Sequence, residues 1–180
     1  MVEYHYDRIS HALPFAMVVP NASFDETVVS GLTFSVDGDD SAYAFAQNDR
    51  ELCLLDCTFQ FGRTSGSVVF RSGIGASTLL GNQVVGGSLV SGRGDGILVV
   101  RENQIVDGIL CSLGNDQVAA PSEITIVDNV VTGANGAAAV HVFSNGTEPL
   151  VVQILGNSLD GGGVRLIAEP FFFVVGKYRG

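Results

Sequence analysis

The sequence predicts a single-domain, all-β protein: a parallel β-helix of about six coils with an internal asparagine ladder and capped ends. The first observation behind this prediction is an internal repeat with a period near 25 residues. The second is that the apolar runs are short, rich in Val, Ile and Phe, and bounded by Gly, Asn and Asp, which is typical of strands. The third is the composition: 23 of the 180 residues are Gly and only 16% are charged. Average proteins have about 7% Gly and about 25% charged residues.

Six segments carry the repeat, and the fifth position of each marks its register. The segments are 28–34, 53–59, 78–84, 99–105, 125–131 and 153–159. Their fifth positions hold Leu32, Cys57, Asn82, Asn103, Asn129 and Asn157, at intervals of 25, 25, 21, 26 and 28 residues. The residues three positions earlier and two positions later are apolar in every segment, and the residue just before the fifth position is Gly, Asp or Glu. Leu at several fixed spacings, as in a leucine-rich repeat, is missing.

A further short strand is expected in each unit, about six to fourteen residues after the marked position. The candidates are 43–46, 68–70, 88–90, 109–111, 138–142 and 164–167. Two or three short strands per unit would stack on those of the next unit at the ~4.8 Å spacing of a β-sheet. The units therefore predict a solenoid.

The asparagine column has a physical reason at the corner of a solenoid. Inward-pointing amides in successive coils can donate and accept along the stack, which satisfies buried polar groups that would otherwise cost about 1–3 kcal/mol each. Asparagine also tolerates the left-handed backbone that tight corners need. We therefore expect a structural ladder of Cys57, Asn82, Asn103, Asn129 and Asn157, with apolar packing replacing it toward Leu32.

The Ile/Val/Leu-x-x-Asn-x-Val/Ile/Leu units centred on Asn82, Asn103, Asn129 and Asn157 resemble those of the pectin-lyase-like superfamily of right-handed parallel β-helices. The resemblance covers residues 27–168. It implies a right-handed coil, in agreement with the general rule for parallel crossovers. The superfamily includes polysaccharide lyases, glycoside hydrolases, phage tailspikes and adhesins, so the resemblance implies a fold and no single activity.

The linear catalytic motifs of that superfamily are absent apart from one Asp-Asp pair, so the sequence favours a non-enzymatic protein. Polygalacturonase-like hydrolases carry Asn-Thr-Asp, Asp-Asp, Gly-His-Gly and Arg-Ile-Lys motifs, of which only Asp39-Asp40 occurs. The Arg-x-Pro-x-x-Arg stretch of pectate-lyase-like enzymes does not occur either. Carboxylates contributed by different coils would leave no linear motif, and glycoside hydrolysis would need two of them about 5–9.5 Å apart. Candidates are Asp95, Asp107, Asp116 and Asp128.

Other candidate sites are weak on sequence alone, and we expect no metal site and no cofactor. Asp37, Asp39 and Asp40 offer alternate oxygen ligands for Ca²⁺, but the loop lacks the downstream bidentate Glu of an EF-hand and a solvated turn explains it better. The three cysteines lack metal-binding spacing and are expected as buried thiols. His141 alternates with Val140 and Val142 and is expected on a sheet surface. The Arg93-Gly94-Asp95 tripeptide matches an adhesion motif but lies in a glycine-rich turn.

The two ends of a solenoid expose an apolar cross-section and unpaired strand edges, so caps are expected. We assign residues 1–26 to an N-terminal cap, 27–168 to the β-helix, and 169–180 to a C-terminal cap or an oligomer contact. Phe171, Phe172 and Phe173 are the candidate oligomer contact, because three adjacent phenylalanines cannot all face one core in a strand.

Charge and hydropathy exclude two classes of partner, nucleic acids and the membrane interior. The net charge of −10 excludes a general nucleic-acid binder, which needs a basic face. Apolar runs are too short to insert into a membrane. No convincing signal peptide opens the chain, although the resemblance favours an extracellular or virion-surface location.

We therefore expect a structural or binding module that self-associates within a larger assembly, such as a virion, tail fibre or cell-surface filament. A polysaccharide is a further candidate partner. The alternative is a polysaccharide lyase or glycoside hydrolase.

Overall fold

The computed structural model describes residues 15–18, 26–36, 42–46, 51–62, 66–71, 77–92, 97–113, 122–134, 138–144, 150–168 and 172–177. Within these segments every regular element is a β-strand, and the strands pair in parallel. No helix that could cross a membrane occurs in this part of the chain. The predicted all-β class and the parallel β-solenoid are thus confirmed.

Twenty strands form three parallel sheets, here called A, B and C. Sheet A consists of β1 (Phe15–Val18), β4 (Ala42–Ala46), β7 (Gly66–Arg71), β10 (Gly87–Gly92), β13 (Leu110–Leu113), β16 (Val140–Ser144) and β19 (Val164–Ala168). Sheet B consists of β2 (Glu26–Ser30), β5 (Glu51–Leu55), β8 (Ser77–Leu80), β11 (Ile97–Arg101), β14 (Ser122–Val127), β17 (Leu150–Leu155) and β20 (Phe172–Lys177). Sheet C consists of β3 (Thr33–Val36), β6 (Thr58–Phe61), β9 (Gln83–Val85), β12 (Gln104–Val106), β15 (Val130–Thr132) and β18 (Ser158–Leu159).

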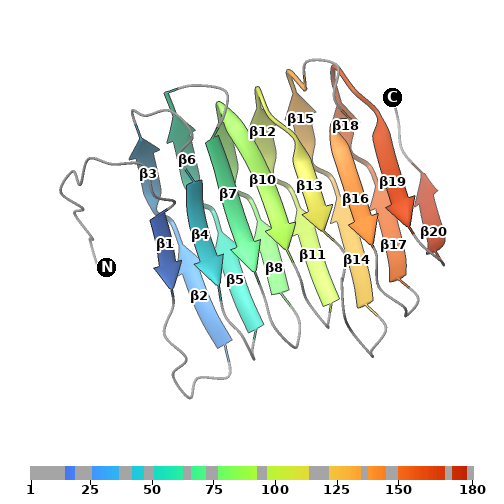
Figure 1. The fold of residues 1–180 in the computed structure, drawn as a ribbon, viewed down its shortest axis with the longest axis horizontal. Coiled ribbons are helices and arrows are strands. Elements are labelled where there is room, and N and C mark those ends of the chain that lie inside the picture. The colour runs from blue at the N-terminus through green and yellow to red at the C-terminus, as the bar shows by residue number, and fades with distance from the viewer. Residues whose placement is uncertain are drawn as a thin grey trace.

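Each coil contributes one strand to each sheet, so that every third strand of the sequence lies beside its counterpart (Figure 1). The strands of sheet A run down the near face, and those of sheets B and C return up the far face while the chain advances from β1 toward β20. This path is a right-handed coil, as the crossover rule requires. The predicted count of about six coils agrees only roughly with sheets of seven, seven and six strands.

The core is built from matching rows of apolar side chains, one row or more from each sheet. Alternation along each strand turns these residues inward, where they are almost completely buried. Fully buried examples are Leu89, Leu110 and Val140 in sheet A, Leu54, Leu79, Val100 and Ile126 in sheet B, and Phe59, Val84, Ile105 and Val131 in sheet C. Near the N-terminal end of the core the rings of Phe34 and Phe59 stack in parallel, with centroids 4.9 Å apart.

The sheets extend into both segments expected at the ends of the solenoid. β1 lies within residues 1–26 and pairs with β4. β20 lies within residues 169–180 and pairs with β17, so that Phe172 is opposite Leu150 and Phe173 is opposite Val151. The six further strands expected after the marked positions all occur, as β4, β7, β10, β13, β16 and β19, with shifts of one or two residues at their ends.

Candidate functional site

The most regular feature of the repeat is the corner between sheets B and C. Its first residue adopts a left-handed backbone in all six coils, with φ between 51° and 67°. These residues are Gly31, Asp56, Gly81, Glu102, Asp128 and Gly156. Left-handed backbone costs a non-glycine residue roughly 1–2 kcal/mol, which explains why the column favours Gly and Asp. The residue that follows is the one predicted for the ladder.

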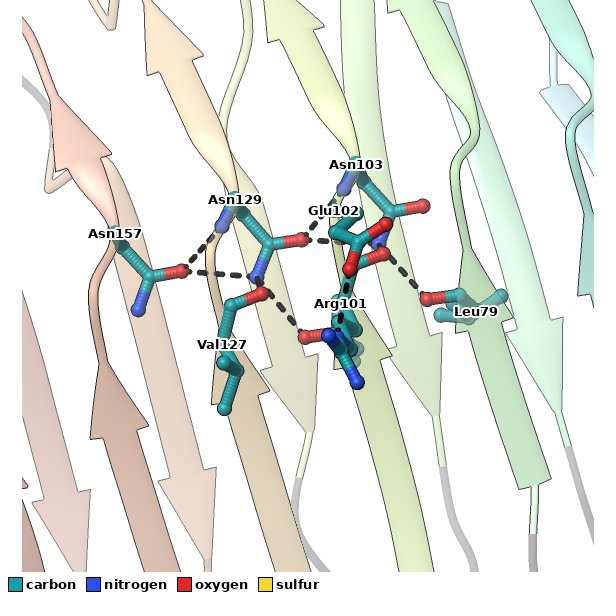
Figure 2. A network of polar contacts seen from close by, with 8 residues as sticks. Leu79, Arg101, Glu102, Asn103, Val127, Asn129 and Asn157 are labelled. Carbon is teal, nitrogen blue, oxygen red and sulfur yellow. Dashed lines mark hydrogen bonds and ion pairs between the residues drawn. The ribbon is translucent and has the colours of Figure 1, made fainter.

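The four asparagines of the ladder are buried, each at most 1% exposed, and they form one continuous hydrogen-bonded column. Asn103 Oδ1 accepts from the backbone N–H of Asn82 at 3.0 Å and from Asn82 Nδ2 at 2.9 Å. Asn129 Oδ1 accepts in the same way from Asn103, and Asn157 Oδ1 from Asn129 (Figure 2). The predicted structural ladder is therefore present. The chain bends at this corner, and the buried side-chain oxygen of every ladder asparagine accepts a hydrogen bond.

The amide nitrogens also tie each coil to the one before it. Asn103 Nδ2 donates to the carbonyl of Leu79 at 2.8 Å, and Asn129 Nδ2 donates to the carbonyl of Val100 at 2.9 Å. Asn157 repeats the pattern with Ile126 at 2.9 Å. In each case the acceptor lies three residues before the preceding ladder position, so one side chain fixes the register of two coils.

Cys57 continues the column with a thiol in place of an amide. Its backbone N–H donates to Asn82 Oδ1 at 3.0 Å, and its Sγ lies 3.4 Å from the carbonyl of Leu55 and 3.7 Å from that of Val29. These carbonyls correspond to the amide acceptors of the later coils. Burial raises the pKa of the Cys57 thiol above its ordinary value of 9.0, so the group is a neutral structural thiol.

A second left-handed corner, between sheets C and A, was not predicted. It contains Gly86, Asp107, Gly133 and Gly161, with φ between 57° and 85°. Each of these residues lies four positions after a ladder asparagine, and that spacing was the sequence signal that could have revealed it. The two corners confine the sheet C strands of these coils to two or three residues.

The outward face of sheet B, called the sheet B face below, combines aliphatic and charged side chains with Ser30, Cys53, Thr78, Thr125 and Gln153. Its side chains alternate with the buried row that contains Leu54 and Val100, and Val28 and Ile97 are 51% and 47% exposed. The aliphatic members are Val28, Leu55, Leu80, Ile97, Val99, Val127, Val151 and Leu155. The described charged members are Arg101, which contacts Glu102 through Nε at 2.8 Å, and Glu123, which accepts from Gln153 Nε2 at 3.1 Å.

The outward face of sheet C is polar but uncharged. It exposes rows of hydroxyl and amide side chains. In one of these rows Gln83 Nε2 lies 3.4 Å from Gln104 Oε1, which is a weak contact. The polar members are Thr33, Ser35, Thr58, Gln60, Gln83, Gln104, Thr132 and Ser158. Exposed Val130 and the half-buried Val85 and Val106 interrupt these rows.

Carboxylates in the described segments lie mostly at the corners. Asp56, Glu102 and Asp128 border sheet C on one side, and Asp107 and Asp160 border it on the other; all five are exposed. Asp107 and Asp128 of the predicted carboxylate set thus stand at opposite corners, with sheet C between them. Asp95 and Asp116 lie outside the described residues. No group of three or more His, Cys, Asp or Glu side chains suited to a metal ion occurs in the segments that the structure describes.

The remaining predicted residues divide into described and undescribed positions. His141 is half-buried between the fully buried Val140 and Val142, and its Nε2 is buried without a hydrogen-bond partner. Its register partners in sheet A are Cys111 and Arg165. Asp37, Asp39, Asp40, the tripeptide 93–95 and Phe171 lie outside the described residues, as do the side chains of Phe172 and Phe173.

Comparison with known proteins adds no identity to this geometry. No protein family, curated protein or solved structure matches the chain.

Proposed function

We propose that this chain is a non-enzymatic β-helix module that self-associates within a larger assembly, such as a virion, a tail fibre or a cell-surface filament. The single observation that carries the proposal is the sheet B face, to which each of six neighbouring strands contributes at least one outward aliphatic side chain among polar ones. Monomeric proteins rarely expose contiguous apolar patches beyond a few hundred Å², and such patches usually mark association surfaces.

Kinship with the pectin-lyase-like β-helices is part of the same proposal. It is supported by the parallel solenoid and by the buried asparagine column at the corner between sheets B and C. An extracellular or virion-surface location follows from this kinship and belongs to the proposal as well.

Sedimentation equilibrium of the purified chain over a concentration series tests the proposal. We expect the weight-average mass to rise from 18.8 kDa toward a multiple of that value as concentration increases. A constant mass of 18.8 kDa at every concentration would contradict it. The release of new reducing ends or unsaturated products from a panel of polysaccharides would instead establish the alternative, a lyase or hydrolase.

Contact with a neutral polysaccharide is a second candidate function, favoured by the uncharged face of sheet C. Thr58, Gln83 and Gln104 can exchange hydrogen bonds with sugar hydroxyls, and Val130 offers an apolar patch beside them. The acidic corners that flank this face would repel a polyanionic chain. Affinity electrophoresis in gels containing neutral or acidic polysaccharides distinguishes the two, because only the neutral polymer should retard the protein. Equal mobility in all gels would refute this candidate.

A further inference from the structure

We propose that the sheet B face is the contact between two copies of this chain, packed side by side with their solenoid axes parallel and their sheet B strands antiparallel across the interface. The inference rests on the proposed self-association and names the surface and geometry that produce it.

The aliphatic rows supply the attraction. Leu55 and Leu80 are neighbours in one outward row, Val127 and Leu155 are neighbours farther along it, and Arg101 lies between the two pairs. Val99 lies at the middle of β11, the fourth of the seven strands in the sheet. Two such faces packed about 10 Å apart would interdigitate like the inner faces of a β-sandwich.

The charged side chains of the sheet B face favour a second copy of this chain as the partner and determine its orientation. Arg101 ends β11, whereas Glu123 lies near the start of the adjacent strand β14, in register with Ile97. Consider a two-fold axis that lies parallel to the solenoid axis and passes over the middle of β11. It makes the facing strands of the two copies antiparallel, so that Arg101 of one copy approaches Ile97 and Glu123 of the other. A two-fold axis parallel to the strands would instead place Arg101 beside Arg101, which is unfavourable. The face is therefore complementary to itself in the first orientation.

The existing contacts of these two side chains leave capacity for the interface. Arg101 uses Nε for Glu102, and a guanidinium has five N–H donors. Glu123 accepts a hydrogen bond from Gln153, and a carboxylate offers about four acceptor positions. Both residues can therefore form an intermolecular pair without giving up their contacts within the chain.

The area of the face suits a weak, reversible dimer. Seven strands at about 4.8 Å spacing and five residues per strand give a face of roughly 30 by 16 Å. Two such faces bury on the order of 1,000 Å² together, which lies at the low end for specific complexes. We therefore expect association that depends on protein concentration.

Two charge-reversal variants, measured alone and as an equimolar mixture, test the proposed orientation of the two copies directly. Arg101→Glu places two carboxylates together at both symmetry-related contacts of a homodimer, and Glu123→Arg places two guanidinium groups together. Each variant alone should associate about tenfold more weakly than the wild type. An equimolar mixture of the two variants should regain association close to wild type, because both contacts in the mixed dimer again join opposite charges.

Asp160→Arg is the matched control, because it changes the net charge by the same amount as Glu123→Arg at an exposed corner remote from the sheet B face. Sedimentation equilibrium gives the association constant, and circular dichroism verifies that each variant is folded. The control should associate as the wild type does. A monomeric wild type overturns the proposed function together with this inference. A self-associating wild type whose association is unchanged by Arg101→Glu or Glu123→Arg, or is not regained on mixing, overturns this inference alone.

Discussion

Asn103 illustrates how much of the fold depends on a single side chain. Its carboxamide accepts from both the main chain and the side chain of Asn82, and donates to the carbonyl of Leu79 and to Asn129 Oδ1. The sequence predicted this role from spacing alone, because a carboxamide can donate and accept at the same time in a column of identical neighbours. It placed Cys57 in the same column but did not predict the acceptors of its thiol, which are backbone carbonyls that only the folded register supplies.

Replacing Asn103 by Ala should destabilise the protein by about 2–4 kcal/mol. The substitution leaves the buried N–H of Asn82 and the carbonyl of Leu79 without their partners. Urea unfolding followed by circular dichroism measures the change. Gln104→Ala is the matched control, since Gln104 is the next residue and its side chain is exposed, so its cost should stay within about 0.5 kcal/mol. Equal costs for the two variants would show that the amide column carries no stability.

Cys57 should make the protein lose stability in alkali. Burial raises the pKa of the folded thiol above 9.0, whereas the unfolded thiol ionises near its ordinary value. The contribution of Cys57 is therefore fully present below about pH 9 and falls as the pH rises through the pKa of the folded thiol. Urea unfolding in a pH series should show this loss in the wild type and a smaller loss in Cys57→Ser. An identical alkaline slope in both proteins would assign the effect to other groups.

At the scale of one coil, two left-handed corners enclose a strand of only two or three residues in the later coils. The sequence revealed the corner before the asparagine, because Gly, Asp or Glu recurs there in all six units. The corner four residues later occurs only from Gly86 onward. In the two earlier coils the same position holds Val36 and Phe61, which continue their strands. The signal is confined to the four units that carry an asparagine, so it does not stand out in a comparison of all six units.

Gly108 should tolerate no side chain, although its φ is not left-handed. A Cβ at this position would overlap the backbone carbonyl oxygen of Gly87 in the neighbouring coil, and backbone cannot rotate away. Gly108→Ala should therefore cost about 1–3 kcal/mol. Gly163→Ala is the matched control, because a Cβ there would meet nothing within 4 Å. Thermal unfolding of the two variants tests the difference, and an unchanged Tm for Gly108→Ala would refute the packing argument.

At the scale of the whole molecule, the repeat predicted the stacking of coils but not the character of each outer face. The period identifies which residues point inward, since they must be apolar in every coil. Outward residues obey no such rule, and the row of Leu55, Leu80, Arg101, Val127 and Leu155, aliphatic except for Arg101, became visible only when the register placed these residues side by side. The charges that orient a second copy, on Arg101 and Glu123, come from different coils for the same reason.

Small-angle X-ray scattering of the concentrated wild-type protein tests the central claim, that this solenoid self-associates side by side through sheet B. Seven stacked strands give the coil axis a length of about 30 Å, and side-by-side pairing leaves this axis unchanged while it widens the cross-section. Side-by-side pairing should double the mass obtained from the scattering while the maximum dimension increases only slightly. A particle of doubled mass that is extended by about another 30 Å would show end-to-end association and contradict the account. A mass that stays at 18.8 kDa would contradict it as well.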